Sequence, residues 1–379
     1  MKEVYLDNAA TTKVTPKVAD KVKQVMTKEY GNPSSLHNKG LAAEKVIKEA
    51  RENLAHKLQV EAKEIFFTSG GTEANNLAIK GALKTLRNKG NRIITSSIEH
   101  PSVLNVFKEL EEEWDVKYLE VDHKGSINLD QLEKLLTADT VLVSIMAVNN
   151  ETGTIQPLKK ISNILKSHKN LYWHVDGIQA LGKVNILPDK LGINLYSMSA
   201  HKIHGPMGVG ALYVSSDTRL KSLVQGSSQE EGLRPGTENV PGIAGFGKAI
   251  KLLPSKEEIK DMYQLKKDLT TRILTEIDDV FLNGPQIEQG AAHIVNMSVA
   301  GLRGEVVVHS LEEEGIYIST GAACSSRQAN SHVLEALEVG PDLITGALRF
   351  SFSLNNTKEE IDYTVDILKN KVTMLRKYM

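Results

Sequence analysis

The feature that most constrains the fold is an alternation of short apolar segments with longer segments of helical periodicity. Several short segments are apolar throughout, as strands of a parallel sheet covered on both faces are. Predicted strands cover 65–67, 92–96, 116–121, 140–147, 171–176, 195–199 and 209–214. A helical segment over 41–58 carries one apolar stripe with charged residues outside it. This pattern predicts an α/β fold with a mostly parallel central sheet flanked by helices.

The pattern changes near Leu253-Pro254-Ser255, which indicates a domain boundary. The segments predicted beyond it are helices over 256–275 and 305–314, strands over 294–298, 316–320 and 348–354, and a last helix. Thr357 and Glu360 fit a capping box at the start of that last helix. We therefore expect a large domain over 15–256 and a smaller α+β domain made of 1–14 and 257–379.

Composition excludes several classes of protein. The 46 basic and 47 acidic residues give a net charge of −1, so no global basic field exists for coating nucleic acid. No apolar run approaches the roughly 18 residues that span a bilayer, and the acidic residues near the N-terminus do not fit a signal peptide. The single cysteine, Cys324, excludes an intrachain disulfide and a multi-cysteine metal site. We expect a cytoplasmic protein without direct nucleic-acid or membrane binding.

Five segments place reactive or ligand-binding residue types at a strand end or a glycine-rich turn, where open α/β sheets bind ligands. The first is Thr-Ser-Gly-Gly-Thr-Glu at 68–73, which can hold an anion on free backbone N–H groups or serve as an ordinary capped turn. It lacks Gly-Lys-Ser/Thr, so it is no nucleotide P-loop. The second contains Asp176, which ends an apolar strand and needs a partner there. That partner is either a protonated ring nitrogen or a structural group.

The other three segments contain Lys202, Cys324 and Arg349. Lys202 follows a predicted buried strand between two histidines, where a lysine amine can form a Schiff base with an aldehyde. Cys324 lies among small polar residues, so it is either an accessible nucleophile or an inert thiol. Arg349 lies inside a predicted strand, where it binds a ligand carboxylate or forms a structural salt bridge. Together, the segments match the needs of a pyridoxal phosphate (PLP) enzyme: a phosphate cradle, an acid, a lysine and a carboxylate clamp.

The sequence resembles a known family over nearly its whole length. The motifs that carry the resemblance are Tyr-Leu-Asp-Asn-Ala-Ala-Thr-Thr at 5–12, Tyr-Gly-Asn-Pro-Ser-Ser-Leu-His at 30–37, Val-Asn-Asn-Glu-Thr-Gly at 148–153, and Ser-Ala-His-Lys at 199–202. They resemble those of cysteine desulfurases of the NifS/IscS type, in the class V aminotransferase family of fold-type I PLP enzymes. The resemblance implies the PLP-dependent transferase fold of type I.

The resemblance also implies a cofactor site. Lys202 would hold PLP as a Schiff base, Asp176 would bond the ring nitrogen, and His100 would stack on the ring and assist proton transfers. Further implied contacts are Gly71, Thr72, Ser199 and His201 on the phosphate, with Gln179 and Asn150 at the phenolic oxygen. Thr237 would reach the phosphate of a second subunit, which implies a homodimer.

The implied reaction removes sulfur from L-cysteine. Arg349, assisted by Asn32 and by Asn150, would clamp the substrate carboxylate, and Lys202 would remove the Cα proton. The Cys324 thiolate would attack the substrate sulfur, which releases L-alanine and leaves a Cys324 persulfide. A sulfur-acceptor protein would take this sulfur for iron–sulfur cluster assembly or for thiolation of tRNA or a cofactor.

Three departures from the family pattern and three alternatives accompany this interpretation. The chain has Met207, Ser227-Ser228 and Pro235 where the family commonly has Lys, Gly-Gly and Ser. The alternatives are another class V PLP enzyme, such as an aminotransferase or a selenocysteine lyase, a non-catalytic scaffold with this fold, and a nucleotide-binding dehydrogenase. Cys324 argues against a transaminase, which has no use for a thiol there. The sequence lacks a Gly-x-Gly-x-x-Gly after a strand, which argues against the dehydrogenase.

Overall fold

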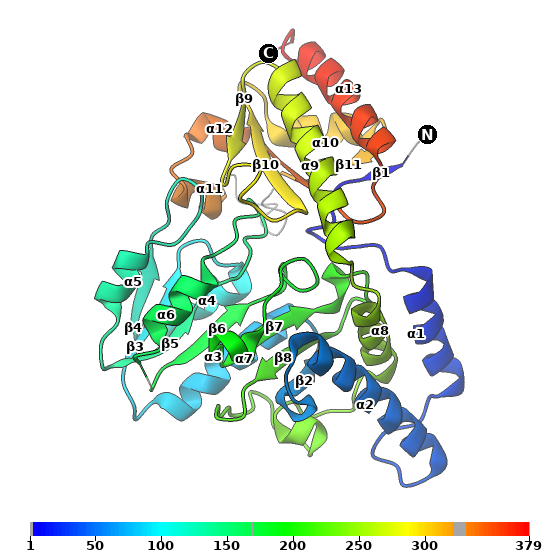
Figure 1. Cartoon of the computed structure of the whole chain (residues 1–379), viewed down its shortest axis with the longest axis vertical. Coiled ribbons are helices and arrows are strands. Elements are labelled where there is room, and N and C mark those ends of the chain that lie inside the picture. Colours follow the sequence, from blue (N-terminus) through cyan, green and yellow to red (C-terminus); the bar gives the residue numbers. More distant parts are fainter. Residues whose placement is uncertain (1–2, 169, 321–330, 379) are drawn as a thin grey trace.

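The computed structural model describes residues 3–168, 170–320 and 331–378, and a seven-stranded sheet forms the centre of its larger part (Figure 1). The spatial order is β2-β8-β7-β6-β5-β3-β4. The strands are β2 (Ile65–Thr68), β3 (Arg92–Ser96), β4 (Asp115–Leu119), β5 (Thr140–Ser144), β6 (Tyr172–Asp176), β7 (Leu195–Ser199) and β8 (Gly210–Val214). Only β8 pairs antiparallel, with β7 and β2. The predicted α/β fold with a mostly parallel sheet is therefore confirmed.

Helices cover both faces of this sheet. The helices of this part are α1 (Pro16–Lys28), α2 (Asn38–Leu58), α3 (Gly71–Leu86), α4 (Pro101–Leu110), α5 (Leu129–Leu135), α6 (Leu158–Leu165), α7 (Pro188–Leu191) and α8 (Val240–Lys251). Apolar residues of α3 and α4 form one core with one face of the sheet. Apolar residues of α1, α2, α6 and α8 form a second core with the other face. Because both faces are covered, the central strands β5, β6 and β7 are buried almost throughout.

A smaller unit is built on a three-stranded antiparallel sheet in which β10 lies between β12 and β9. Its elements are α9 (Lys256–Glu276), β9 (Val280–Asn283), β10 (Ile294–Val299), α10 (Gly304–Glu312), β11 (Ile316–Tyr317), α11 (His332–Ala336), α12 (Pro341–Thr345), β12 (Ala347–Ser351) and α13 (Lys358–Leu375). The strand predicted over 316–320 is shorter than expected. It pairs as β11 with β1 (Val4–Tyr5), and Ser319 forms a single bridge to Arg349.

The first residues of the chain belong structurally with its last third. Val4 and Leu6 lie in the same apolar core as residues of α9, β10, α10, β12 and α13. This core is separate from the two cores of the large sheet. The exact bounds of the two domains stay a prediction.

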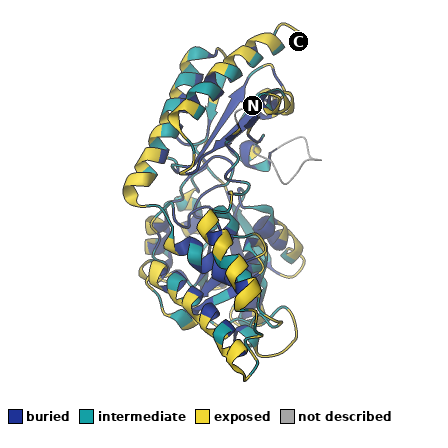
Figure 2. Cartoon of the chain, turned by 90° about the vertical axis from the view of Figure 1, so that its right-hand side faces the viewer, coloured by how far each residue is buried: buried dark blue, intermediate teal, exposed yellow. Residues whose placement is uncertain are grey.

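The distribution of burial follows this architecture (Figure 2). Most strands are dark blue, whereas the edge strands β4 and β9 are largely of intermediate burial, and the outer helices show an exposed face of yellow residues. In the part of the chain that the structure describes, no helix is both long and apolar enough to cross a bilayer.

The predicted capping box of the last helix is present in both halves. The Thr357 hydroxyl accepts from the Glu360 N–H at 3.3 Å, and Glu360 Oε2 accepts from the Thr357 N–H at 3.2 Å. The helix that follows buries Ile361, Val365 and Leu368 in the small-domain core. The cap therefore fixes the start of a helix whose inner face stabilises that domain.

Replacing Thr357 by Ala should lower the free energy of unfolding by about 1 kcal/mol, because the N–H of Glu360 loses its acceptor. Thr357→Ser keeps the hydroxyl and should unfold close to the wild type. Urea denaturation followed by circular dichroism measures both variants. An equal loss in the two variants would show that the hydroxyl hydrogen bond is not the source of the stability.

Candidate active site

The predicted site residues gather at the carboxyl ends of two neighbouring parallel strands. Asp176 ends β6, Ser199 ends β7, and Lys202 follows at once in a 3₁₀ turn over Ala200–Lys202. The α3 helix begins at Gly71, directly beside them: a Cβ at Gly71 would lie 3.6 Å from the Ser199 Cβ. Parallel strands end at one edge of a sheet, so residues far apart in sequence meet there.

Asp176 is a buried carboxylate with defined partners. Its side chain accepts hydrogen bonds from the Ile178 N–H at 3.0 Å and from Asn75 Nδ2 at 2.8 Å, and the residue is only 5% exposed. Burial raises the pKa of Asp176, whereas the nearby His100 and these two hydrogen bonds oppose the rise. A buried carboxylate in this position is stabilised further by any cation that binds above it.

Asn75 connects Asp176 to His100 through Ser102. Asn75 Nδ2 donates to Asp176 and to Ser102 Oγ at 2.9 Å, and Ser102 Oγ lies 2.8 Å from His100 Nδ1. The Ser102 N–H also donates to that Nδ1 at 3.1 Å. His100 Nδ1 is therefore an acceptor, which places the proton of the neutral ring on Nε2. Burial lowers the pKa of His100, which favours this neutral form.

Sequence reasoning missed Asn75 and Ser102. The signal in the sequence is an asparagine among the apolar positions of α3, beside Ala74 and Leu77, and the structure buries it fully. A buried amide on such a face needs polar partners, and here those partners are the predicted ring acid and the residue that orients His100.

Lys202 is held by the N-terminal segment. Its Nζ donates to the carbonyl oxygens of Ala9 and Ala10, both at 2.6 Å. The same Ala9 oxygen accepts from Gln179 Nε2 at 2.9 Å. Gln179 Oε1 in turn lies 3.3 Å from His293 Nε2, which precedes β10 in the small unit. The structure thus brings Lys202 and Gln179 together as predicted, through backbone that the sequence analysis did not assign to the site.

A second lysine, Lys183, contacts the backbone of Lys202. Lys183 Nζ donates to the Lys202 carbonyl oxygen at 2.8 Å. Burial, and then the charge of Lys202, lower the pKa of Lys183 to about 7. This contact fixes the backbone that carries Lys202.

Arg349 lies in β12 with its side chain 3% exposed. Its Nη2 donates to Asp7 Oδ1 at 2.8 Å, and its Nη1 donates to the Asn150 carbonyl oxygen at 3.0 Å. The prediction that an arginine inside this strand has an anionic partner is met within the chain by Asp7. The Asn150 backbone and Arg349 are therefore neighbours, and their role in binding a carboxylate stays a prediction.

The residues predicted for a phosphate frame an anion site. The hydroxyl of Ser199 is fully buried, and among the described residues it has no hydrogen-bond partner. It lies beside the first turn of α3, where N–H groups without helical acceptors attract an anion. Thr72 is exposed in that turn, and His201 Nδ1 lies 3.2 Å from Thr11 Oγ1. The orphaned hydroxyl and the helix start fit a phosphate group, so the residues present fit PLP.

Two predicted residues lie apart from this cluster. Asn32 is exposed in the α1–α2 connection, and its Oδ1 accepts from the Ser34 N–H. That connection lies at the far end of the molecule from the three-stranded sheet that carries Arg349 (Figure 1), so Asn32 does not assist the Arg349 of its own chain. Thr237 is exposed just before α8, and its contact with a second subunit stays a prediction.

Cys324 lies outside the described residues, but the chain on both sides of it is placed at the site. On one side, the Ser319 N–H donates to the Arg349 carbonyl oxygen at 3.2 Å. On the other, Ser331 Oγ donates to Glu151 Oε2 at 2.5 Å, and Glu151 follows Asn150 in sequence. The segment with the thiol therefore starts and ends beside the predicted substrate clamp.

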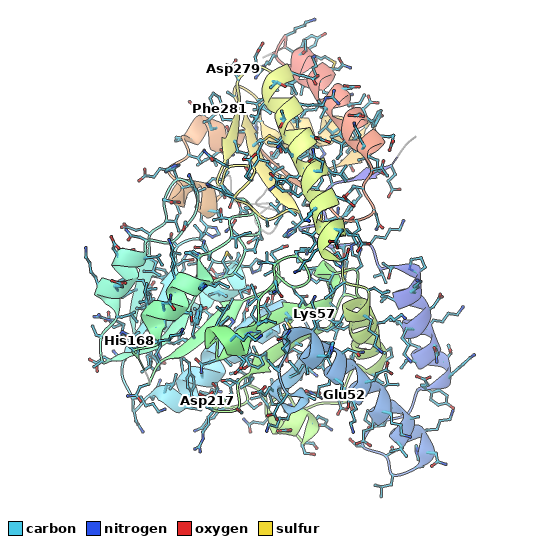
Figure 3. All side chains as sticks on the ribbon, viewed as in Figure 1. Glu52, Lys57, His168, Asp217, Asp279 and Phe281 are labelled. Carbon is cyan, nitrogen blue, oxygen red and sulfur yellow. The ribbon has the colours of Figure 1, made fainter. Side chains whose placement is uncertain are left out.

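The opposite end of the small unit is remote from this cluster. Figure 3 labels Asp279 and the exposed Phe281 at the outer end of the three-stranded sheet. The register places Val299 at that end and Ile294, which follows His293, at the other. The inner end of β10 thus faces the large sheet.

A buried histidine supports the strands that carry the site. His174 lies two residues before Asp176 in β6, with Nδ1 2.8 Å from Ser144 Oγ in β5 and Nε2 2.9 Å from Ser197 Oγ in β7. Burial lowers the pKa of His174 to about 3. The ring therefore stays neutral and links three central strands.

The folded protein excludes a proton that unfolded His174 binds below its ordinary pKa of 6.5. The free energy of unfolding therefore does not depend on the protonation of His174 above pH 6.5. Below pH 6.5 it falls by about 1.4 kcal/mol per pH unit as the pH drops toward 3, because only the unfolded chain binds the proton. His174→Gln should be less stable at neutral pH, but its unfolding free energy should fall less steeply between pH 6.5 and about pH 5. Urea denaturation at several pH values measures the slopes, and equal slopes would contradict this assignment.

Comparisons with known proteins agree with this geometry. The class V aminotransferase family matches residues 4–364. A protein named Cysteine desulfurase IscS from Dictyoglomus turgidum is 44% identical over 379 residues, covering 99% of this chain and 96% of the relative. Another of that name, from Methanosarcina thermophila, is 43% identical over 378 residues, covering 99% and 93%. A solved NifS-like protein has a TM-score of 0.93 at 37% identity, covering 98% of this chain and 100% of the other. The predicted fold and family are confirmed, and the chain belongs to the class V aminotransferases.

Proposed function

We propose that this protein is a cysteine desulfurase that uses PLP to remove sulfur from L-cysteine and releases L-alanine. The observation that carries the proposal is the meeting of Asp176, Lys202 and the orphaned Ser199 hydroxyl at one sheet edge. Arg349 of the small unit bonds Asp7, and the backbone of the same turn bonds Lys202. Two of the relatives that match the chain over nearly its full length carry the name of this activity. The alternative of a non-catalytic scaffold leaves this arrangement without a purpose.

The residues present divide the work of holding the cofactor. When bound, PLP would supply an aldehyde that joins an amine and a ring that draws electrons from the substrate Cα. Ser199 and the first turn of α3 would bind its phosphate. Asp176 would hold a proton on the ring nitrogen, because a buried carboxylate gains from a cation beside it. His100 would lie against the ring in its neutral form, oriented by Ser102.

Substrate binding uses the other side of the site. Arg349 would bind the carboxylate of L-cysteine, because a guanidinium holds a carboxylate with directed hydrogen bonds. Lys202 Nζ would move the proton from the substrate Cα, and its hydrogen bonds to Ala9 and Ala10 aim the amine. Both groups sit on fixed backbone, which is the positioning that such a reaction needs.

Cys324 would take the sulfur. Its thiolate attacks the substrate sulfur, the sulfur–sulfur bond forms, and the bond between that sulfur and Cβ breaks. Cβ gains the electron pair and a proton to become the methyl group of alanine, while the transferred sulfur is oxidised to the persulfide level. The sum is L-cysteine plus one thiol giving L-alanine plus one persulfide, so no external oxidant is needed. Support comes from Ser319 and Ser331 on either side of the segment that contains Cys324, which bond the Arg349 carbonyl oxygen and the Glu151 side chain.

The proposal extends to partners and location. A thiol that accepts sulfur must pass it on, so we propose a sulfur-acceptor protein of iron–sulfur cluster assembly or of tRNA or cofactor thiolation. Asn32 and Thr237 are exposed and lie apart from the site of their own chain. This supports a homodimer in which they would contact the site of the partner subunit. A single reactive thiol is maintained in a reducing compartment, which supports the cytoplasm.

Incubation of the holoenzyme with L-cysteine, followed by assay of alanine and protein-bound persulfide, tests the function. The wild type should form both. Cys324→Ser should keep the absorbance of bound cofactor but lose the persulfide and form alanine at least about a hundredfold more slowly, since it lacks the acceptor nucleophile. Lys202→Ala is the matched control, because it should lose the cofactor adduct as well. Undiminished alanine formation in Cys324→Ser would overturn the role of the thiol.

A further inference from the structure

Asp7 makes a contact that neither the predicted site nor the proposed reaction explains. Its carboxylate bonds the Nη2 of Arg349 at 2.8 Å, although Arg349 is the group proposed to bind the substrate carboxylate. The Asp7 side chain is 21% exposed, while that of Arg349 is 3% exposed. The aspartate is therefore the more exposed partner of this ion pair.

The backbone holds Asp7 firmly in this place. Asp7 forms a bridge to Ser351 of β12, and Asn8 Nδ2 donates to the Ser351 carbonyl oxygen at 2.9 Å. The Ala9 N–H donates to Ser351 Oγ at 2.8 Å. Ser351 is two residues from Arg349 in the same strand, so Asp7 and the guanidinium are presented by adjoining backbone. Its position is set by the fold and does not depend on a flexible side chain alone.

The same turn also carries the acceptors of the lysine. The Asp7 carbonyl oxygen accepts from the Ala10 N–H at 3.0 Å, which closes the turn, and the Ala9 and Ala10 carbonyl oxygens then accept from Lys202. One short segment thus contacts both Lys202, the proposed cofactor lysine, and Arg349, the proposed carboxylate-binding residue.

We infer that Asp7 is a specificity-determining residue whose carboxylate competes with the substrate carboxylate for Arg349. In the resting protein Asp7 supplies a negative charge to a buried guanidinium. An incoming carboxylate must displace Asp7 from Nη2 against like-charge repulsion. A ligand with a carboxylate alone gains little from this exchange, whereas an amino acid would also join the cofactor aldehyde through its amine, in place of Lys202. This inference rests on the proposed role of Arg349 in binding the substrate carboxylate.

The competition predicts opposite effects of one substitution on stability and on ligand binding. Asp7→Asn should lower the melting temperature of the ligand-free holoenzyme, because the buried Arg349 loses the negative charge of Asp7. Propionate, a carboxylate without an amine, should then raise the melting temperature of Asp7→Asn clearly more than that of the wild type. In turnover, the KM for L-cysteine and the inhibition constant of propionate should both fall about tenfold, with kcat changed little.

Two further variants keep the test decisive. Asp7→Glu retains the charge and should respond to propionate as the wild type does. Glu3→Gln removes one exposed negative charge four residues before Asp7 and should leave all readouts unchanged. Equal propionate shifts in wild type and Asp7→Asn, or a KM that rises in Asp7→Asn, would overturn the competition. The melting shifts need no turnover, so a failure to form alanine from L-cysteine would count against the proposed function and not against this inference.

Discussion

The site depends on the bonds between the Lys202 amine and the carbonyl oxygens of Ala9 and Ala10. These bonds join a turn at the end of the large sheet to a segment whose neighbours Val4 and Leu6 are buried in the small-domain core. The N-terminal segment therefore links the two units at the place where the predicted chemistry occurs. Gln179, which bonds the same Ala9 oxygen, and the small unit's His293 add a second link. Loss of this segment would remove the acceptors that aim the amine.

Burial sets the electrostatics of the cluster. Asp176 and His100 are coupled through Asn75 and Ser102, so the carboxylate and the ring are oriented by one hydrogen-bonded chain. The pKa of Asp176 is raised and that of His100 is lowered because both groups are removed from water. A cationic ring nitrogen above Asp176 would relieve the first of these costs. The ionised Asp176 carboxylate is therefore more stable with a cationic group beside it than without one.

Much of the fold was predictable, because a sheet covered on both faces needs apolar strands and the helices between them need one apolar stripe. The capping box at Thr357 is a local pattern and was predictable for that reason. Asn75 was missed because its importance depends on which strand end α3 faces, which periodicity does not specify. Asp7 was missed because its partner is 342 residues away in sequence. The proposed homodimer would place Asn32 and Thr237 at a partner subunit, and the pattern of a single chain does not specify such contacts.

The central claim is that the amine of Lys202 carries the cofactor aldehyde. Reduction of the holoenzyme with borohydride makes such a link permanent, and peptide mapping by mass spectrometry then finds the modified residue. The account predicts a single pyridoxyl label on Lys202. A label on another lysine, such as the adjacent Lys183, or no label at all in a protein that has been saturated with PLP, would contradict it.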